Sequence, residues 1–85
     1  MDRLGNRISE IEQQINLVKN PQFKRDLRLM LRNAAKRIKI LSNIAIELRR
    51  NPQSVSIQTR CVDMYNEIES DLTRVSKWAL MGMLS

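Results

Sequence analysis

Apolar side chains recur at alternating steps of three and four residues along most of this 85-residue sequence. Such spacing places them on one side of an α-helix, whereas a half-buried strand would alternate at every second residue. Two Gly, two Pro and 4% aromatic residues are also too few for the turns and strands of a β-sandwich or barrel. The chain is therefore expected to be all-α. Its longest apolar series contains Leu27, Leu31, Ala34, Ile38, Leu41, Ala45 and Leu48.

Two Asn-Pro dipeptides, Asn20-Pro21 and Asn51-Pro52, divide the periodic sequence into three segments. Asn is a favoured N-cap residue, and Pro fits the first helical position because its missing N–H would have no partner there. Ser54 is an alternative cap for the third helix, which would leave Pro52-Gln53 in the connection. We expect a single domain spanning residues 1–85, with helices at about 2–19, 21–50 and 54–81.

The second helix would be about 45 Å long at 1.5 Å per residue. One 85-residue chain cannot easily cover so long an apolar stripe, and small chains often complete their core by oligomerisation. We therefore expect a homodimer that associates through the first two helices into a four-helix-type bundle. The residues assigned to the core or dimer contact are Leu27, Leu31, Ile38, Leu41, Ala45 and Leu48.

Basic residues exceed acidic ones by fifteen to nine, and the excess lies in the second helix. Residues 21–51 contain nine basic and two acidic side chains, a net charge of +7, whereas the whole chain carries +6. Like charges one turn apart repel, so this pattern favours an anion-binding face over the alternative of a plain solvated face. At 100° per residue, the side opposite the apolar stripe holds Arg25, Arg28, Arg32, Lys36, Lys39, Asn43 and Arg50.

The chemistry of this face suits a nucleic-acid backbone. Long basic side chains bind phosphates, whereas single-strand binders also offer aromatic platforms on which bases stack. The three aromatic residues are Phe23, Tyr65 and Trp78, and the first two fall on or near the apolar stripes. No zinc knuckle, glycine-rich loop or aromatic ribonucleoprotein motif is present, so recognition of duplex backbone and shape is expected.

The composition argues against an enzyme. The sequence contains no His and only one Cys, so the commonest general base and metal ligand is missing and a zinc site is not expected. No metal, cofactor or small-molecule substrate is predicted. The apolar run Trp78–Leu84 is far shorter than the roughly 20 residues of a spanning helix, so we expect a soluble chain.

The remaining notable side chains have structural interpretations. Cys61 is expected to be a buried small hydrophobe. The run Trp78–Leu84 is expected to close the bundle or contact a partner subunit, with a membrane or viral protein as the alternative. Core or dimer packing is expected for Met30, Met64, Met81 and Met83, and a solvated face for Glu67, Glu69 and Asp71.

Part of the sequence resembles the nodavirus RNA-silencing suppressors, small proteins encoded at the end of the viral replicase RNA. The resemblance covers some 30 of the 85 residues, from Phe23-Lys24-Arg25-Asp26-Leu27-Arg28 to Arg49-Arg50-Asn51-Pro52-Gln53-Ser54-Val55. It consists of a basic-Asp-Leu start, a long helix with one basic face, and a turn that contains Pro.

The resemblance implies an all-α homodimer that lies along A-form duplex RNA, contacting its backbone and 2′-hydroxyls without reading sequence. Such proteins shield long duplexes and small interfering RNAs from Dicer and from the host silencing machinery. By position, Arg25 and Lys36 would contact RNA, while Asn43 stands where a basic residue would be expected. The longer third helix is a second departure from the family pattern.

The sequence therefore predicts a dimeric double-stranded-RNA-binding protein that suppresses RNA silencing in the host-cell cytoplasm. Contact with Dicer or the viral replicase is left open. The first alternative is a helical DNA-binding or RNA-regulatory accessory protein of a plasmid or phage. A second is a membrane-surface protein whose basic helix lies on anionic lipid, which is disfavoured because partner helices can cover the apolar stripe.

Overall fold

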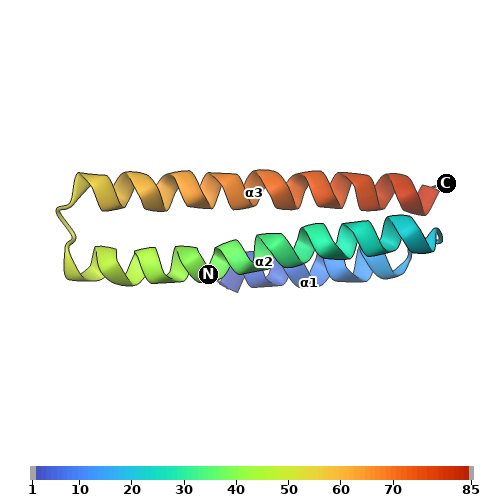
Figure 1. Ribbon diagram of the computed structural model, residues 1–85, viewed down its shortest axis with the longest axis horizontal. Coiled ribbons are helices and arrows are strands. Elements are labelled where there is room, and N and C mark those ends of the chain that lie inside the picture. The colour runs from blue at the N-terminus through green and yellow to red at the C-terminus, as the bar shows by residue number, and fades with distance from the viewer. Residues whose placement is uncertain (1, 85) are drawn as a thin grey trace.

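The computed structural model describes residues 2–84 and the side chains of residues 3–84, and it is all-α as predicted. Three helices follow one another: α1 (Asp2–Asn16), α2 (Pro21–Arg50) and α3 (Val55–Leu84), with no strand in this part of the chain. The two 30-residue helices α2 and α3 form an antiparallel hairpin, and the 15-residue α1 lies beside one end of it (Figure 1). The molecule is a rod with extents of 49 × 18 × 15 Å.

The ends of α2 are those predicted from the Asn-Pro dipeptides. The Asn20 side-chain oxygen accepts hydrogen bonds from the N–H groups of Gln22 (2.9 Å) and Phe23 (3.1 Å), and Pro21 occupies the first helical position. Two N–H groups that have no partner within the helix are thereby satisfied. The Asn51 N–H donates to carbonyls at the end of α2, so this Asn closes α2 and does not begin α3.

The other two helices differ from their predicted bounds. α1 ends at Asn16 and not at residue 19, because its last turn tightens: the Leu17 and Val18 N–H groups bond to carbonyls three residues back. α3 begins at Val55, where the Ser54 hydroxyl accepts from the Ile57 N–H (3.3 Å), which confirms the alternative cap. It continues to Leu84, three residues beyond the predicted end.

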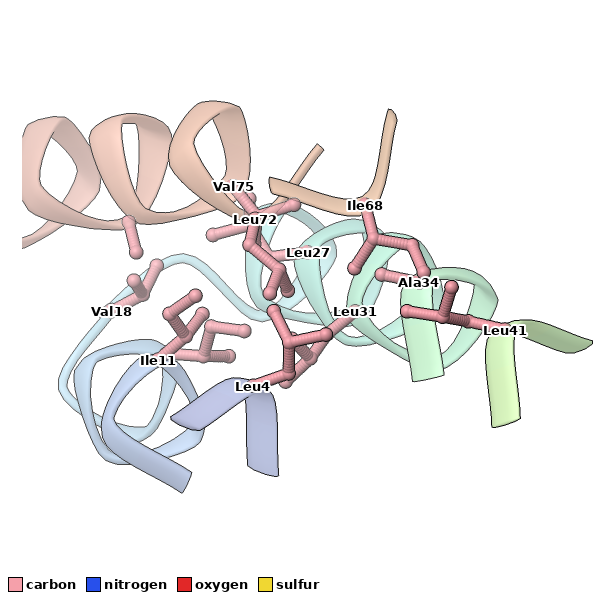
Figure 2. Close-up of a cluster of buried hydrophobic side chains, with 12 residues drawn as sticks. Leu4, Ile11, Val18, Leu27, Leu31, Ala34, Leu41, Ile68, Leu72 and Val75 are labelled. Atoms are coloured by element: carbon pink, nitrogen blue, oxygen red, sulfur yellow. The ribbon is translucent and has the colours of Figure 1, made fainter. Parts of the chain in front are cut away.

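The core lies where all three helices meet (Figure 2). Three of the six predicted core or dimer residues, Leu27, Leu31 and Leu41, are buried there. The other three are only half-buried. Ala45 and Leu48 lie at the far end of the hairpin, which α1 is too short to cover, whereas Ile38 packs against the core. The remaining core side chains are Leu4, Ile11, Ile15, Val18, Ala34, Ile68, Leu72, Val75 and Ala79.

The other residues that were predicted to pack in the core differ in how deeply they are buried. Phe23 and Tyr65 pack against the core, as predicted. Met30, Met64 and Met83 also do so, whereas Met81 is 59% exposed. Cys61 is half-buried and not fully buried, because it lies near the end of the hairpin that α1 leaves open.

The C-terminal run closes the bundle through its small residues. Ala79 and Gly82 are buried, while Trp78, Leu80, Met81 and Leu84 are exposed. A Cβ at Gly82 would lie 2.6 Å from Cε2 of Phe23 and 3.2 Å from Cγ1 of Val18. Gly is therefore kept inside this helix by close packing, and it does not end the helix.

The two glycines provide a matched test of this packing. Gly82→Ala should lower the melting temperature, because overpacking costs about 1–3 kcal/mol and outweighs the gain in helix propensity. Gly5→Ala should raise it, by about 0.5 kcal/mol in stability, because nothing lies within 4 Å of a Cβ at that position. Thermal unfolding followed by circular dichroism measures both. If Gly82→Ala were as stabilising as Gly5→Ala, the result would contradict close packing of Gly82 against Phe23.

Candidate nucleic-acid interface

The side of α2 that faces away from α3 carries the predicted anion-binding residues. Leu27, Ala34 and Leu41 point into the core and fix the rotation of the helix about its axis. The opposite side is thereby turned to solvent. All seven predicted side chains are exposed there, and we call them the basic face: Arg25, Arg28, Arg32, Lys36, Lys39, Asn43 and Arg50.

The basic face makes almost no contact within the protein. Arg28 donates one hydrogen bond to the side-chain oxygen of Asn16 in α1 (2.9 Å). The other six side chains have no hydrogen bond or ion pair with any residue of the described range 3–84. Their polar atoms are therefore available to an external partner.

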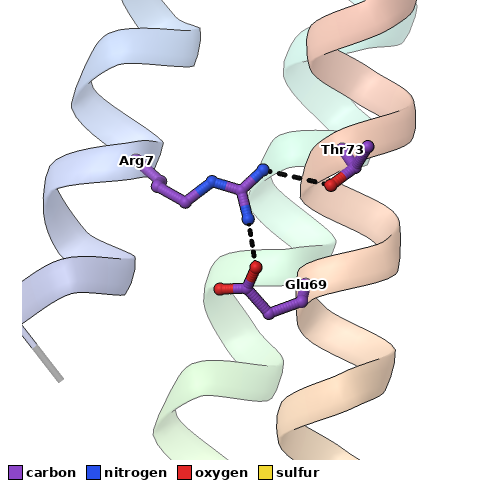
Figure 3. A network of polar contacts seen from close by, with 3 residues as sticks. All are labelled: Arg7, Glu69 and Thr73. Carbon is purple, nitrogen blue, oxygen red and sulfur yellow. Dashed lines mark hydrogen bonds and ion pairs between the residues drawn. The ribbon is translucent and has the colours of Figure 1, made fainter.

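The ion pairs of the molecule involve other basic residues. Arg7 of α1 binds Glu69 of α3 and donates to the Thr73 hydroxyl at 3.2 Å (Figure 3). Arg37 of α2 binds Asp71 of α3. The expectation that Glu69 and Asp71 belong to a solvated acidic face is wrong, because both are half-buried and hold helices together.

This arrangement separates the two kinds of basic residue on α2. Arg37 points toward α3 and is neutralised by Asp71, while the residues of the basic face form no ion pair within the described structure. A third, longer ion pair joins Arg60 to Glu47 at 3.9 Å near the far end of the hairpin. The positive potential is therefore concentrated on the outer side of α2.

The basic residues are not evenly spread along α2. Arg25, Arg28, Arg32, Lys36 and Lys39 form a continuous block about 21 Å long at the helical rise. After Lys39 no basic residue follows until Arg49 and Arg50, and the interval contains Asn43 and Glu47. The predicted face therefore has a gap in positive charge between Lys39 and Arg50.

A pocket of about 480 Å³ lies between α1 and α2 along the edge of the basic face. Arg28 and Arg32 line it together with Glu12 and Asn16 of α1. Asn16 is a residue that the sequence analysis missed, since its contact with Arg28 depends on how α1 folds back. Its side chain holds Arg28 at the edge of the face.

The surroundings of the basic face contain no stacking platform. Phe23 and Tyr65 pack against the core, and Trp78 lies on α3 with 42% of its surface exposed. No cluster of metal-binding side chains occurs among the described residues, and no helix in that range could cross a bilayer. No protein-family model, curated protein or solved structure matches this chain.

The unpaired charges should reduce the stability of the folded chain. Arg32→Gln should stabilise it by a few tenths of a kcal/mol in low salt, because it removes repulsion from Arg28 and Lys36 one turn away. Arg37→Gln should instead destabilise it by about 0.5–1 kcal/mol, because the ion pair with Asp71 is lost. Urea unfolding at low and high salt measures both effects, and the gain at Arg32 should vanish at high salt. A loss of stability in Arg32→Gln would contradict this account.

Proposed function

We propose that this protein is a non-enzymatic, homodimeric double-stranded-RNA-binding protein. The observation that carries the proposal is the basic face: a straight row of exposed Arg and Lys side chains with no acidic partner within the described structure. Phosphates of a nucleic-acid backbone supply the negative charges that such a row lacks. A rigid helix presents them along a line, as a regular duplex requires.

The chemistry of the face favours a duplex over a single strand. Single strands bind strongly to proteins that stack bases on aromatic rings, and the aromatic residues here lie on other surfaces. Long basic side chains without such rings contact phosphates and sugar hydroxyls, and these contacts carry little sequence information. Binding through the shape of an A-form duplex follows from this chemistry.

The resemblance to the nodavirus suppressors suggests a biological role for this RNA binding, namely suppression of RNA silencing. The similar stretch, from Phe23 to Val55, contains the whole basic face. By this resemblance, the protein would coat duplex RNA, including small interfering RNA, in the host-cell cytoplasm. Dicer and the small-RNA loading machinery would then lose access to it.

The membrane-surface alternative is poorly supported by the packing. An interfacial helix must lay its apolar side on lipid, but the apolar side of α2 is buried against α1 and α3 for most of its length. The protein would have to open its core to bind in that way. Duplex DNA offers a similar line of phosphates, and it is therefore included as a competitor in the tests below.

Binding should be sequence-independent and strongest for duplex RNA, weaker for duplex DNA and weakest for single strands. A dimer that makes 6–10 phosphate contacts should lose about 10³–10⁵ in affinity between 50 and 200 mM salt, using the calibration for duplex DNA. Band-shift or anisotropy titrations on nucleic acids of equal length measure this. Equal affinity for all three would mean that binding is only non-specific electrostatic attraction. A strong preference for one RNA sequence would refute recognition by shape.

Single substitutions should locate the interface. Arg32→Ala and Lys36→Ala should each weaken RNA binding and lower the salt slope by about two, one contact from each chain of the dimer. Helix content should be unchanged, because both side chains are exposed. The matched controls are Lys77→Ala, an exposed cation on α3, and Arg49→Ala, which lies off the basic face. If the controls weaken binding as much as the test variants, the single-face hypothesis is wrong.

A further inference from the structure

One end of the hairpin is not covered by α1. Counting back from the Asn16–Arg28 and Arg7–Glu69 contacts, α1 begins level with about Ser42 of α2 and Met64 of α3. Beyond that level only two helices remain, residues 43–50 and 55–63, which are joined by the turn 51–54. We call residues 43–63 the arm; it lies at the left of Figure 1, beyond the N-terminus.

The arm continues the surface that α1 covers elsewhere. On α3, Val62 lies on the same side as Glu69 and Thr73, the residues that bind Arg7, because seven and eleven residues are nearly whole numbers of turns. On α2, Ile46 lies three turns beyond Ala35, which faces α1 across their shared pocket. The groove that α1 fills therefore extends along the arm, where no helix of the described residues covers it.

The base of this part of the groove is apolar. A pocket of about 330 Å³ opens at the base of the arm and is lined by Leu41, Cys61, Val62 and Tyr65. Val62 is 58% exposed, and Ile46 is exposed to a similar extent. The opposite side of the hairpin is more polar, since its pocket is lined in part by Asn33, Arg37, Asp71 and Arg74. Among these surfaces, the arm groove has the strongest reason to be covered by apolar side chains.

We propose that the arm groove is the self-association surface of this protein and that the arm of a second copy occupies it. The rest of the groove already holds a helix of this chain, α1, so its width and lining suit helices of this kind. Two arms stacked face to face would form a short four-helix bundle, which is a common way to bury such faces. The contact would use α2 and α3, and not the first two helices, because the apolar stripe of α1 is already buried within the chain.

The position of α1 selects the orientation of the second copy. A parallel copy would place its helices where α1 already lies. An antiparallel copy overlaps along the arms alone, with each turn 51–54 against the start of the other copy's α1. This twofold arrangement sets α2 beside α2 and α3 beside α3. Closed twofold pairs of this kind are the commonest oligomers.

The charge pattern of α2 fits this arrangement. In the antiparallel pair, the part of α2 that lies beside its counterpart is residues 43–50, in which Arg49 and Arg50 at the very end are the basic residues. Like charges therefore do not meet along most of the contact. Arg50 of the second copy falls close to the level of Asn43, the position where the basic face lacks a charge. The two basic faces then point the same way and join into one longer surface; this last consequence rests on the proposed function.

Sedimentation equilibrium on the full chain tests the surface. We expect a dimer at micromolar concentration, and Val62→Asp should weaken it at least 100-fold, because each copy would bury an unpaired carboxylate. The control is Leu80→Asp: Leu80 lies on α3, on the same side as Val62 five turns further on, and is 46% exposed. It should leave the mass unchanged. Circular dichroism should show that both variants keep their helices, since both side chains are exposed in the single chain.

Three outcomes would overturn the proposal: a monomeric wild type, equal dissociation by Leu80→Asp, or dissociation by Ile40→Asp on the opposite side in place of Val62→Asp. RNA binding separates this surface from the proposed function. A dimer that Val62→Asp dissociates but that binds no duplex RNA would refute the function and support the surface. A wild type that binds duplex RNA as a monomer would refute the surface and the dimeric form of the proposed function, but not the RNA binding itself.

Discussion

The architecture depends on a mismatch in helix length. Two helices of 30 residues pack against one of 15, so α1 can cover only part of the apolar groove between α2 and α3. Where it does, Leu4, Ile11 and Ile15 complete a dry core with the longer helices. Where it does not, Ala45 and Leu48 stay half-exposed although they continue the same stripe. The partial exposure of these two residues therefore follows from where α1 begins.

The distribution of charge shows a second division. Basic residues that point between helices are paired with carboxylates, as Arg7 is with Glu69 and Arg37 with Asp71. Those that point outward from α2 form no ion pair in the described structure, although pairing with acidic residues would stabilise the helix better. Local departures of this kind from the most stable arrangement are expected at functional sites. The basic residues between the helices are thus paired with carboxylates, and the excess positive charge lies on the outer side of α2.

The sequence predicted the elements well and the contacts between them poorly. The bounds of α2 follow from local chemistry, since Asn20 and Pro21 fix its start through hydrogen bonds two and three residues away. The orientation of the basic face follows from helical periodicity in the same way. The ion pairs of Glu69 and Asp71 could not be predicted, because their partners lie 62 and 34 residues away and depend on the tertiary arrangement. Ile44 was missed as a buried residue because it lies off the main apolar stripe of α2.

The parallel alignment of α1 with α3 has a consequence for the order in which the chain acquires structure. The hairpin of α2 and α3 can form around the turn at 51–54 as soon as both helices have been synthesised. The contacts of α1 with Glu69 and Ser76 each close a loop of 62 residues, so they form late. During synthesis, α1 emerges from the ribosome before α3, so it cannot make these contacts until α3 has followed. Until α1 docks on the hairpin, the apolar groove between α2 and α3 is exposed along its whole length and not only along the arm.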